Sequence, residues 1–196
     1  MEANDKTSDP TWKAFKKGDR EAFAQIYREQ IKGLLNYGYK ITSDRRLIED
    51  SIQDLFFDIW THRTGLGDTS SIRFYLYKAL RYKIVRNLKL SGSKLTQDID
   101  LSVEELAEFS HETYLIGMEV QSLQMANLKQ LIANLPQRQR EAINLRYYHD
   151  FSNEEIARIM GVNYQSACKF IYSALKNLKL NLRVSITSWL LLIIFL

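Results

Sequence analysis

The fold is decided by residues 152–179, which read SNEEIARIMGVNYQSACKFIYSALKNLK. Ser152 and Glu155 have the spacing of a capping box, in which each side chain bonds the backbone amide of the other. A helix is therefore predicted to begin near Asn153. Gly161 can adopt the positive φ that a sharp turn needs, so this helix is expected to end in the turn 161–163. The pattern predicts two helices joined by a tight turn.

The second of these helices combines an apolar stripe with an outward face that lacks acids. The residues at helical spacing that are predicted to pack on the preceding helix are Ala167, Ile171, Ala174, Leu175 and Leu178. The outward positions are Gln165, Cys168, Lys169, Tyr172 and Lys176, and no Asp or Glu follows Glu155. Such a face suits a phosphate backbone, so the pattern favours a DNA-binding helix-turn-helix. The alternative interpretation is an ordinary helical hairpin with a solvated face.

Composition indicates an all-α globular protein. The 196 residues are 45% hydrophobic, which is enough for substantial cores, and they include two prolines and eight glycines. Long stretches have helical periodicity, and no run of alternating β-branched residues occurs. A single cysteine excludes an intrachain disulfide framework, and residues 1–9 have no signal-peptide pattern, so we expect a cytoplasmic protein.

The charge distribution divides the chain into two domains. Residues 72–94 hold seven basic residues and no acid, whereas residues 95–113 hold six acids and neither Lys nor Arg. Such a switch is typical of a domain boundary followed by a solvated linker. We therefore expect a helical domain over 9–90, an acidic linker over 91–112, a second helical domain over 113–183, and an apolar tail over 184–196.

Four helices are expected in the first domain. Asp9 can cap a helix that begins with Pro10, and Gly18 with Asp19 can end that helix and cap the next, which is predicted to run to about Tyr39. The third is predicted over 43–62 and the fourth over 70–90, with a polar loop over 61–71 between them. The apolar residues predicted to be buried by the third helix are Ile48, Ile52, Leu55, Phe56 and Ile59.

The fourth helix interleaves aromatic and basic residues. Aromatic rings beside cations suit single-stranded nucleic acid, because stacking on an unpaired base contributes ~1–3 kcal/mol and the cations neutralise phosphates. The alternative is that the rings simply fill the core, which we expect for Phe74 and Leu76. We expect the polar edge with Lys78, Arg81 and Arg86 to contact nucleic acid.

At this point the residues resemble a known family. The segment 49–56, EDSIQDLF, resembles the acidic helix of bacterial sigma-70-type factors, and residues 72–88 resemble the basic and aromatic helix that follows it in their domain 2. Leu135 and Pro136, together with the helix-turn-helix, resemble domain 4. The order and spacing of the modules, in a chain of this length, resemble the extracytoplasmic-function (ECF) subgroup. The resemblance implies an all-α protein of two small domains, sigma domain 2 and sigma domain 4, joined by the acidic linker.

The resemblance also implies a role for each surface. The residues implied to dock on core RNA polymerase are Glu49, Asp50, Gln53, Asp54 and Phe57. Those implied to capture melted minus-10 DNA are Arg73, Tyr77, Lys78, Arg81, Tyr82, Arg86 and Asn87. Those implied to read duplex minus-35 DNA are Asn163, Tyr164, Gln165, Ser166, Lys169 and Lys176. The implied activity is promoter-specific transcription initiation by an alternative sigma factor. The implied partners are core RNA polymerase, promoter DNA and an anti-sigma factor, which in this family is often membrane-anchored.

The outer face of the last helix departs from the family pattern. Many relatives carry several arginines where this chain has Phe170, Ser173 and Leu175. Minus-35 contact is therefore expected to depend more on Lys169, Lys176, Lys179 and Arg183. Phe170 has two interpretations, since it can extend the core or cover a thymine methyl group.

Other functions have weaker support. His62, His111, His149 and Cys168 share no ligand spacing, and no phosphate loop or nucleophile motif is present, so we expect no metal, no cofactor, no small-molecule substrate and no enzymatic activity. The competing hypotheses are a stand-alone helix-turn-helix regulator and a helical adaptor. The apolar run 189–196 would cover only ~12 Å of a ~30 Å bilayer core, so it is predicted either to fold back or to dock on a partner.

Overall fold

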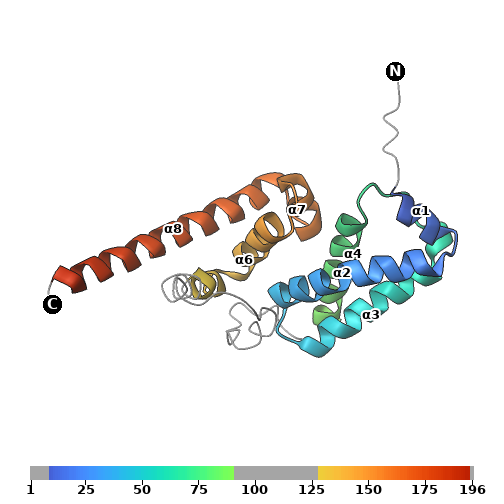
Figure 1. Ribbon diagram of the computed structural model, residues 1–196, viewed down its shortest axis with the longest axis horizontal. Coiled ribbons are helices and arrows are strands. Elements are labelled where there is room, and N and C mark those ends of the chain that lie inside the picture. The colour runs from blue at the N-terminus through green and yellow to red at the C-terminus, as the bar shows by residue number, and fades with distance from the viewer. Residues whose placement is uncertain (1–8, 91–127, 195–196) are drawn as a thin grey trace, which may run out of the picture.

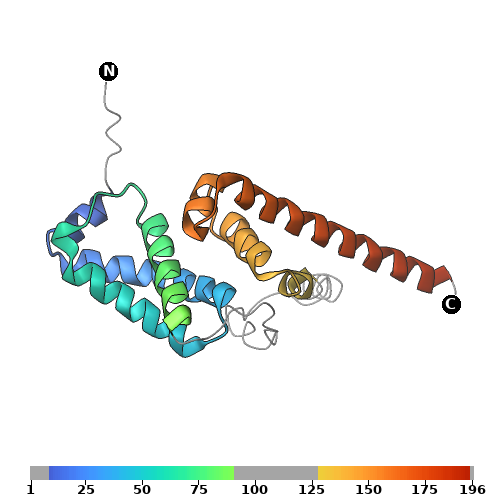
Figure 2. The ribbon, with the colours of Figure 1, turned by 180° about the vertical axis from the view of Figure 1, so that it is seen from behind.

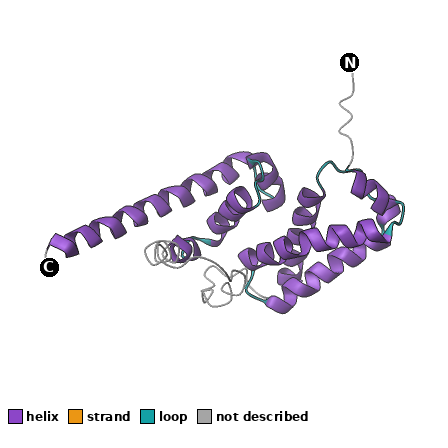
Figure 3. Cartoon of the chain, viewed as in Figure 1, coloured by secondary structure: helices purple, strands orange, loops and turns teal. Residues whose placement is uncertain are grey.

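The computed structural model describes residues 9–90 and 128–194, and their side chains as far as residue 181. It forms two helical lobes, an N-terminal lobe of residues 9–90 and a C-terminal lobe of residues 128–194 (Figure 1). The described part contains helices and loops and no strand, which confirms the predicted all-α class (Figure 3). The linker predicted over 91–112 and the predicted start of the second domain at 113 lie outside the described residues.

Four α-helices build the N-terminal lobe: α1 (Pro10–Lys16), α2 (Arg20–Ile41), α3 (Arg45–Thr61) and α4 (Ile72–Leu90). The predicted caps are confirmed, because the Asp9 carboxylate accepts from the amides of Thr11 and Trp12, and Asp19 accepts from Glu21 and Ala22. Such side-chain acceptors satisfy amides that have no partner inside the helix. The helix bounds differ from the predicted ones by two residues at α2, α3 and α4. The predicted loop 61–71 contains a short 3₁₀ turn, η1 (Arg63–Gly65).

An aromatic cluster joins α1 to the rest of the N-terminal lobe. Trp12 and Phe15 are fully buried, and the Trp12 ring lies 5.1 Å from the Phe15 ring and 5.1 Å from the Tyr75 ring, between centroids. The Trp12 indole Nε1 donates to the Gly67 carbonyl at 3.0 Å. The loop that precedes α4 is therefore held by a buried side chain of α1. The predicted core residues of α3, such as Ile48 and Phe56, are confirmed as buried.

The C-terminal lobe consists of α6 (Gln137–Ile143), η3 (Asn144–Tyr148), α7 (Asn153–Met160) and α8 (Tyr164–Ile194), preceded by a helical turn at 128–133. Its core includes Leu145, Ile156, Met160 and Ala167, all with at most 1% of their surface exposed. The element η3 is a five-residue π-helical turn that the sequence pattern did not predict. It is followed by Asp150, which has φ +52°.

Helix α8 runs on from the helix-turn-helix into the apolar tail. It continues without a break across the predicted boundary between residues 183 and 184, and its C-terminal end projects away from the other described helices (Figures 1 and 2). No helix in the described residues is long and apolar enough to cross a membrane.

Candidate nucleic-acid interface

The helix-turn-helix is built by α7 and α8 from the caps that the sequence predicts. The Ser152 hydroxyl accepts from the Glu155 amide at 3.2 Å, and the Glu155 carboxylate accepts from the Ser152 amide at 2.9 Å. Gly161 ends α7 with φ +64°, and the Val162 amide donates to the Ala157 carbonyl at 3.0 Å. The predicted capping box and left-handed turn are therefore confirmed.

The first turns of α8 present the predicted minus-35 residues. The Asn163 side chain caps the helix by accepting from the Ser166 amide at 2.7 Å. Asn163, Tyr164 and Gln165 are exposed, Ser166 is half-buried, and Lys169 and Lys176 are exposed farther along the same helix. The end of a helix that carries lysines and no acid is well placed to approach phosphates. The role of these residues stays a prediction.

Three positions on α8 lie differently from the sequence pattern. Leu175 was predicted to face the core, but 42% of its surface is exposed, because Ala174 and Leu178 already occupy the packed side. Cys168 was predicted to face outward, but it is half-buried, and the Asn153 amide Nδ2 lies 3.4 Å from its Sγ. Phe170 is partly buried and packs against the core, which favours the first of its two interpretations.

The predicted minus-10 residues of α4 divide into two groups. Lys78, Tyr82 and Arg86 are exposed, and 67% of the Tyr82 surface is accessible. Asn87 is half-buried, and its Nδ2 donates to the Ser51 hydroxyl at 3.2 Å, so this side chain joins α4 to α3. The remaining three, Arg73, Tyr77 and Arg81, point into the contact between the two lobes.

Glu141 of α6 is the centre of that contact. Only 2% of Glu141 is exposed, and its Oε1 accepts from the Tyr37 hydroxyl at 2.9 Å and from the Arg81 Nε at 2.7 Å. Arg138 adds a more distant cation, with Nη1 3.6 Å from Oε2. Burial and the nearby Glu141 charge raise the pKa of Tyr37 well above its ordinary value, so its hydroxyl remains a donor. Residues from three helices thus surround one buried carboxylate.

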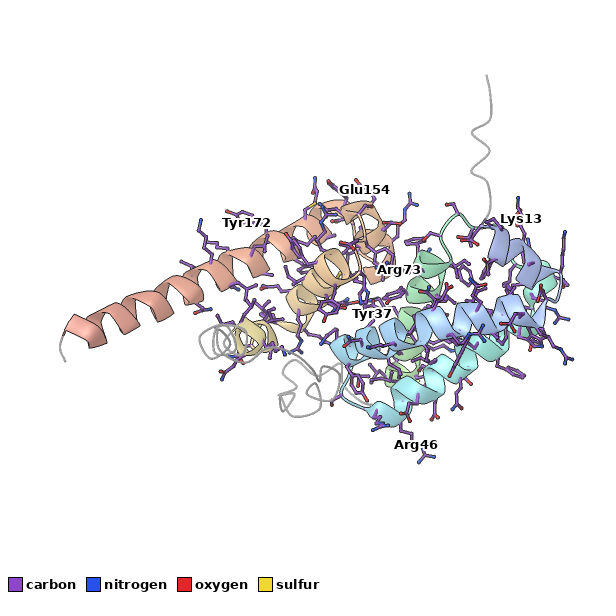
Figure 4. All side chains as sticks on the ribbon, viewed as in Figure 1. Lys13, Tyr37, Arg46, Arg73, Glu154 and Tyr172 are labelled. Atoms are coloured by element: carbon purple, nitrogen blue, oxygen red, sulfur yellow. The ribbon has the colours of Figure 1, made fainter. Side chains whose placement is uncertain are left out.

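His149 forms a second contact between the lobes. Its Nδ1 lies 3.1 Å from the Tyr77 hydroxyl, and its carbonyl accepts from the Arg73 guanidinium, which also lies over the Phe151 ring. Burial, and then the Arg73 charge, lowers the pKa of His149 to about 4, so the imidazole is neutral at pH 7. Burial likewise raises the pKa of Tyr77 to about 12. Figure 4 shows labelled Arg73 and Tyr37 at the junction between the lobes.

A glycine on α2 makes room for this contact. A Cβ atom at Gly33 would lie 2.4 Å from the Tyr77 hydroxyl oxygen and 3.8 Å from His149 Cε1. Any larger residue would displace the Tyr77 side chain, because such a separation is well inside van der Waals contact. We call these six residues the lobe interface: Tyr37, Arg73, Tyr77, Arg81, Glu141 and His149.

A basic groove lies beside the lobe interface. Its volume is about 510 Å³, and it is lined from α4 by Lys78, Arg81, Tyr82, Val85, Arg86, Lys89 and Leu90 and from the α7 side by Arg158, Ile159 and Gly161. No acid lines it. A groove of this charge attracts phosphates, and the exposed Tyr82 ring offers a surface for a base.

The acidic face of α3 has a different character. Asp50, Gln53, Asp54 and Phe57 are exposed, and 68% of the Phe57 surface is accessible, whereas Glu49 is half-buried and accepts from Arg45 Nε at 2.8 Å. An exposed aromatic ring beside carboxylates is a poor surface for DNA and a good one for a protein. The structure thus exposes most of the residues that were predicted to dock on core polymerase. Their docking role stays a prediction.

Sequence reasoning missed the residues that join the lobes. Tyr37, Glu141 and His149 were not singled out for any site, and neither were Lys89 and Arg158 of the groove. One signal was present, because Glu141 is the single acid in the basic segment 137–149.

Comparisons with known proteins cover most of this chain. Residues 125–178 match the family model described as Sigma-70, region 4, and this match includes the helix-turn-helix. The RNA polymerase sigma factor YlaC of Bacillus subtilis (strain 168) is 24% identical over 170 residues, which are 85% of this chain and 95% of the relative. The ECF RNA polymerase sigma factor SigM of the same organism is 21% identical over 155 residues, 79% of this chain and 91% of SigM.

Two solved structures share the fold. CnrH, in complex with the cytosolic domain of CnrY, has a TM-score of 0.57 at 18% identity and covers 89% of this chain and 96% of its own. The sigma factor RpoE from Bartonella quintana, in complex with the anti-sigma factor NepR, has a TM-score of 0.58 at 21% identity and covers 84% and 98%. The arrangement of helices in this chain is therefore similar to theirs.

Proposed function

The chain belongs to the sigma-70 family of RNA polymerase sigma factors, in its ECF subgroup, and we propose that its three described surfaces divide the work of promoter recognition. It is an alternative sigma factor that binds core RNA polymerase and directs transcription initiation at specific promoters. The observation that carries this function is the coincidence of the region 4 match with the capped helix-turn-helix of α7 and α8.

Each surface has a chemistry that fits one task. The acidic and aromatic face of α3, centred on Asp54 and Phe57, docks on core polymerase. The basic face of α4 holds the melted minus-10 strand, because opening a duplex costs about 1.4 kcal/mol per base step and the exposed bases must be captured. The first turns of α8 enter the duplex major groove at the minus-35 element.

The partners follow from the same assignment. The protein acts with core polymerase, with promoter DNA and with an anti-sigma factor, and it uses no small-molecule substrate. We place it in the cytoplasm, where bacterial RNA polymerase works, and we assign it no catalysed reaction of its own. The protein contributes to transcription by binding the promoter and positioning the polymerase on it.

Run-off transcription tests the function. Purified core polymerase is combined with the full chain and a library of genomic fragments from its source organism, and the transcript starts are mapped. A sigma factor produces starts at a defined set of fragments that core polymerase alone does not use. A stand-alone regulator would block or leave unchanged the starts made by another sigma factor, and an adaptor would change none of them.

The docking face gives a first mutational prediction. Asp54→Arg should weaken binding to core polymerase about thirtyfold, because a reversed charge in a docking surface leaves like charges opposed, at a cost of about 2 kcal/mol. Asp54 is exposed and has no described partner, so the variant should keep the fold. Binding is measured by titration of fluorescently labelled protein with core polymerase.

A matched control is available on α2. Glu29→Arg reverses an exposed charge on a different helix of the same lobe, and it should leave core binding unchanged. If Asp54→Arg binds as tightly as the unaltered protein while its circular dichroism is unchanged, the docking assignment is wrong.

The two DNA surfaces give a second prediction. Lys169→Ala should weaken binding to duplex minus-35 DNA and reduce the salt dependence by about 0.9 in the log–log slope, as expected for one lost phosphate contact. Tyr82→Ala should instead weaken binding to pre-melted promoters by about tenfold to a hundredfold, because a stacked base loses its platform. Both side chains are exposed, so neither truncation removes a core contact.

The assay compares polymerase holoenzyme on fully duplex templates and on templates with a pre-melted minus-10 segment. Tyr147→Ala removes an exposed ring on η3, outside the predicted sites, and serves as the control. Equal impairment of both variants on both templates would contradict the division of labour between α4 and α8.

A further inference from the structure

We propose that Glu141 is a built-in competitor for the nucleic-acid strand, because it holds the Arg81 guanidinium in the way that a backbone phosphate would. The inference rests on the proposed function of α4, the capture of melted minus-10 DNA. Its consequence is that the closed arrangement, in which the lobe interface is formed, and a bound strand exclude each other.

The geometry of the pair supports this competition. Arg81 Nε lies 2.7 Å from Glu141 Oε1, and the side chains are 11% and 2% exposed. A guanidinium bonds carboxylate and phosphate oxygens in the same planar geometry, and such charge-assisted bonds are about twice as strong as neutral ones. Arg81 also lines the basic groove, but its Nε is occupied by Glu141 and cannot bond a phosphate while the lobe interface is formed.

Because Glu141 is buried, the competition is between two arrangements of the whole molecule, one with the lobes closed and one with them separated. A buried carboxylate is stable only while its partners are in place, because an unpaired charge in the interior is strongly destabilising. When Arg81 moves to a phosphate, Glu141 keeps the Tyr37 hydroxyl but loses the cation that its Oε1 contacts most closely. Glu141 must then return to water, and for a side chain of α6 this requires that the lobes separate.

The neighbouring contacts reinforce the exclusion. Arg73 and Tyr77 are also predicted to contact the minus-10 strand, and both are engaged by His149 in the same interface. The groove residues Lys78, Tyr82 and Arg86 remain exposed. The closed arrangement therefore covers part of the α4 face and leaves the rest able to attract a strand, which can capture the covered residues when the lobes open.

Glu141 differs from the other acids of its lobe. The described part of that lobe also contains Asp150, Glu154 and Glu155, of which Glu155 caps α7 and the other two are exposed. None of these three makes a described hydrogen bond or ion pair to α4. Glu154 is therefore a matched control, since it carries the same charge on the same lobe outside the interface.

The test uses the full chain with two dyes. In a Cys168→Ser background, Arg46→Cys on α3 and Tyr172→Cys on α8 provide exposed attachment points on opposite lobes (Figure 4). Energy transfer between the dyes reports closure, and the anisotropy of a short fluorescent A/T-rich single-stranded DNA reports binding. Both are measured for the unaltered interface, for Glu141→Gln and for Glu154→Gln.

Glu141→Gln should lower the energy transfer without DNA and tighten strand binding about tenfold. The amide keeps the shape of the side chain but removes the carboxylate charge, so the ion pair with Arg81 becomes a weaker hydrogen bond from the guanidinium to a neutral oxygen, and the apparent affinity rises with the open fraction. Glu154→Gln changes the net charge by the same amount. It should change the energy transfer and the strand affinity only by the small general effect of one charge. Tyr37→Phe, which removes only the hydroxyl donor, should shift both readings in the direction of Glu141→Gln by less.

The outcomes separate failure of this inference from failure of the proposed function. Unchanged energy transfer and affinity in Glu141→Gln, with strand binding still weakened by Tyr82→Ala, would overturn the competition and leave the minus-10 role of α4 intact. Lobe opening without tighter binding, together with no effect of Tyr82→Ala, would overturn both. If Glu141→Gln tightens strand binding and this effect disappears when Arg81→Ala is added, then the Glu141 carboxylate and the DNA phosphate compete for Arg81.

Discussion

Acidification should open the contact between the lobes, with a loss of about 3 kcal/mol between pH 6.5 and pH 4. The responsible group is His149, whose pKa burial lowers from 6.5 to about 4. Between these values the open state binds a proton at His149 and the closed state does not. The closed state therefore has its full stability above pH 6.5, loses it progressively as the pH falls, and loses nothing further from this group below pH 4.

The surroundings of His149 give the direction of the effect. Tyr77 and Arg73 of α4 contact it, the charge of Lys40 on α2 also disfavours the imidazolium, and Asp150 favours it more weakly than burial opposes it. A proton on the ring would therefore place a third cation near Arg73 and Lys40. Separation of the lobes relieves this repulsion and hydrates the ring.

The measurement is a pH titration of the energy transfer between the dyes on α3 and α8. His149→Asn supplies the control, because its amide can replace Nδ1 opposite the Tyr77 hydroxyl but does not titrate. The transition between pH 6.5 and pH 4 should flatten in this variant. An equally steep transition in His149→Asn would assign the pH dependence to other groups.

Trp12→Ala should destabilise the N-terminal lobe by about 3–5 kcal/mol, the usual cost of removing a large buried aromatic side chain. Trp12 is fully buried between Phe15 and Tyr75, and its indole nitrogen donates to the Gly67 carbonyl. The substitution leaves a cavity under α1 and also frees the loop that leads into α4. We therefore expect loss of strand binding even under conditions in which the lobe remains folded.

Urea unfolding followed by circular dichroism measures the stability. Trp12→Phe keeps most of the packing and removes the hydrogen bond, so it should cost less, about 1–2 kcal/mol. Lys13→Ala, at the exposed neighbouring position, should have little effect. A cost below 1 kcal/mol for Trp12→Ala would contradict the central position of this ring in the core.

The family resemblance came from motifs that each lie within one helix or one helical pair. The acidic motif of α3 and the basic motif of α4 each consist of residues that are close together in the sequence. In the structure they lie on separate helices, as expected. The sequence could not say which faces of α4 remain free. Arg73, Tyr77 and Arg81 were grouped with Tyr82 because they share the helix, and the structure separates them because the C-terminal lobe covers one side.

Local order was determined by the sequence alone. The caps at Asp9, Asp19 and Ser152, the turn at Gly161 and the apolar stripe of α8, apart from Leu175, each depend on residues within a few positions of one another, so their physics is complete in a short segment. These features were sufficient for the all-α class and for the helix-turn-helix.

Only the tertiary structure decided how the lobes meet. Glu141 bonds Arg81 and Tyr37 across 60 and 104 positions of the chain, and the π-helical turn that precedes His149 has no pattern of its own in the sequence. Whether a carboxylate becomes buried depends on the shapes and charges of all the surfaces around it. That balance of desolvation and pairing exists only when both lobes are folded and in contact.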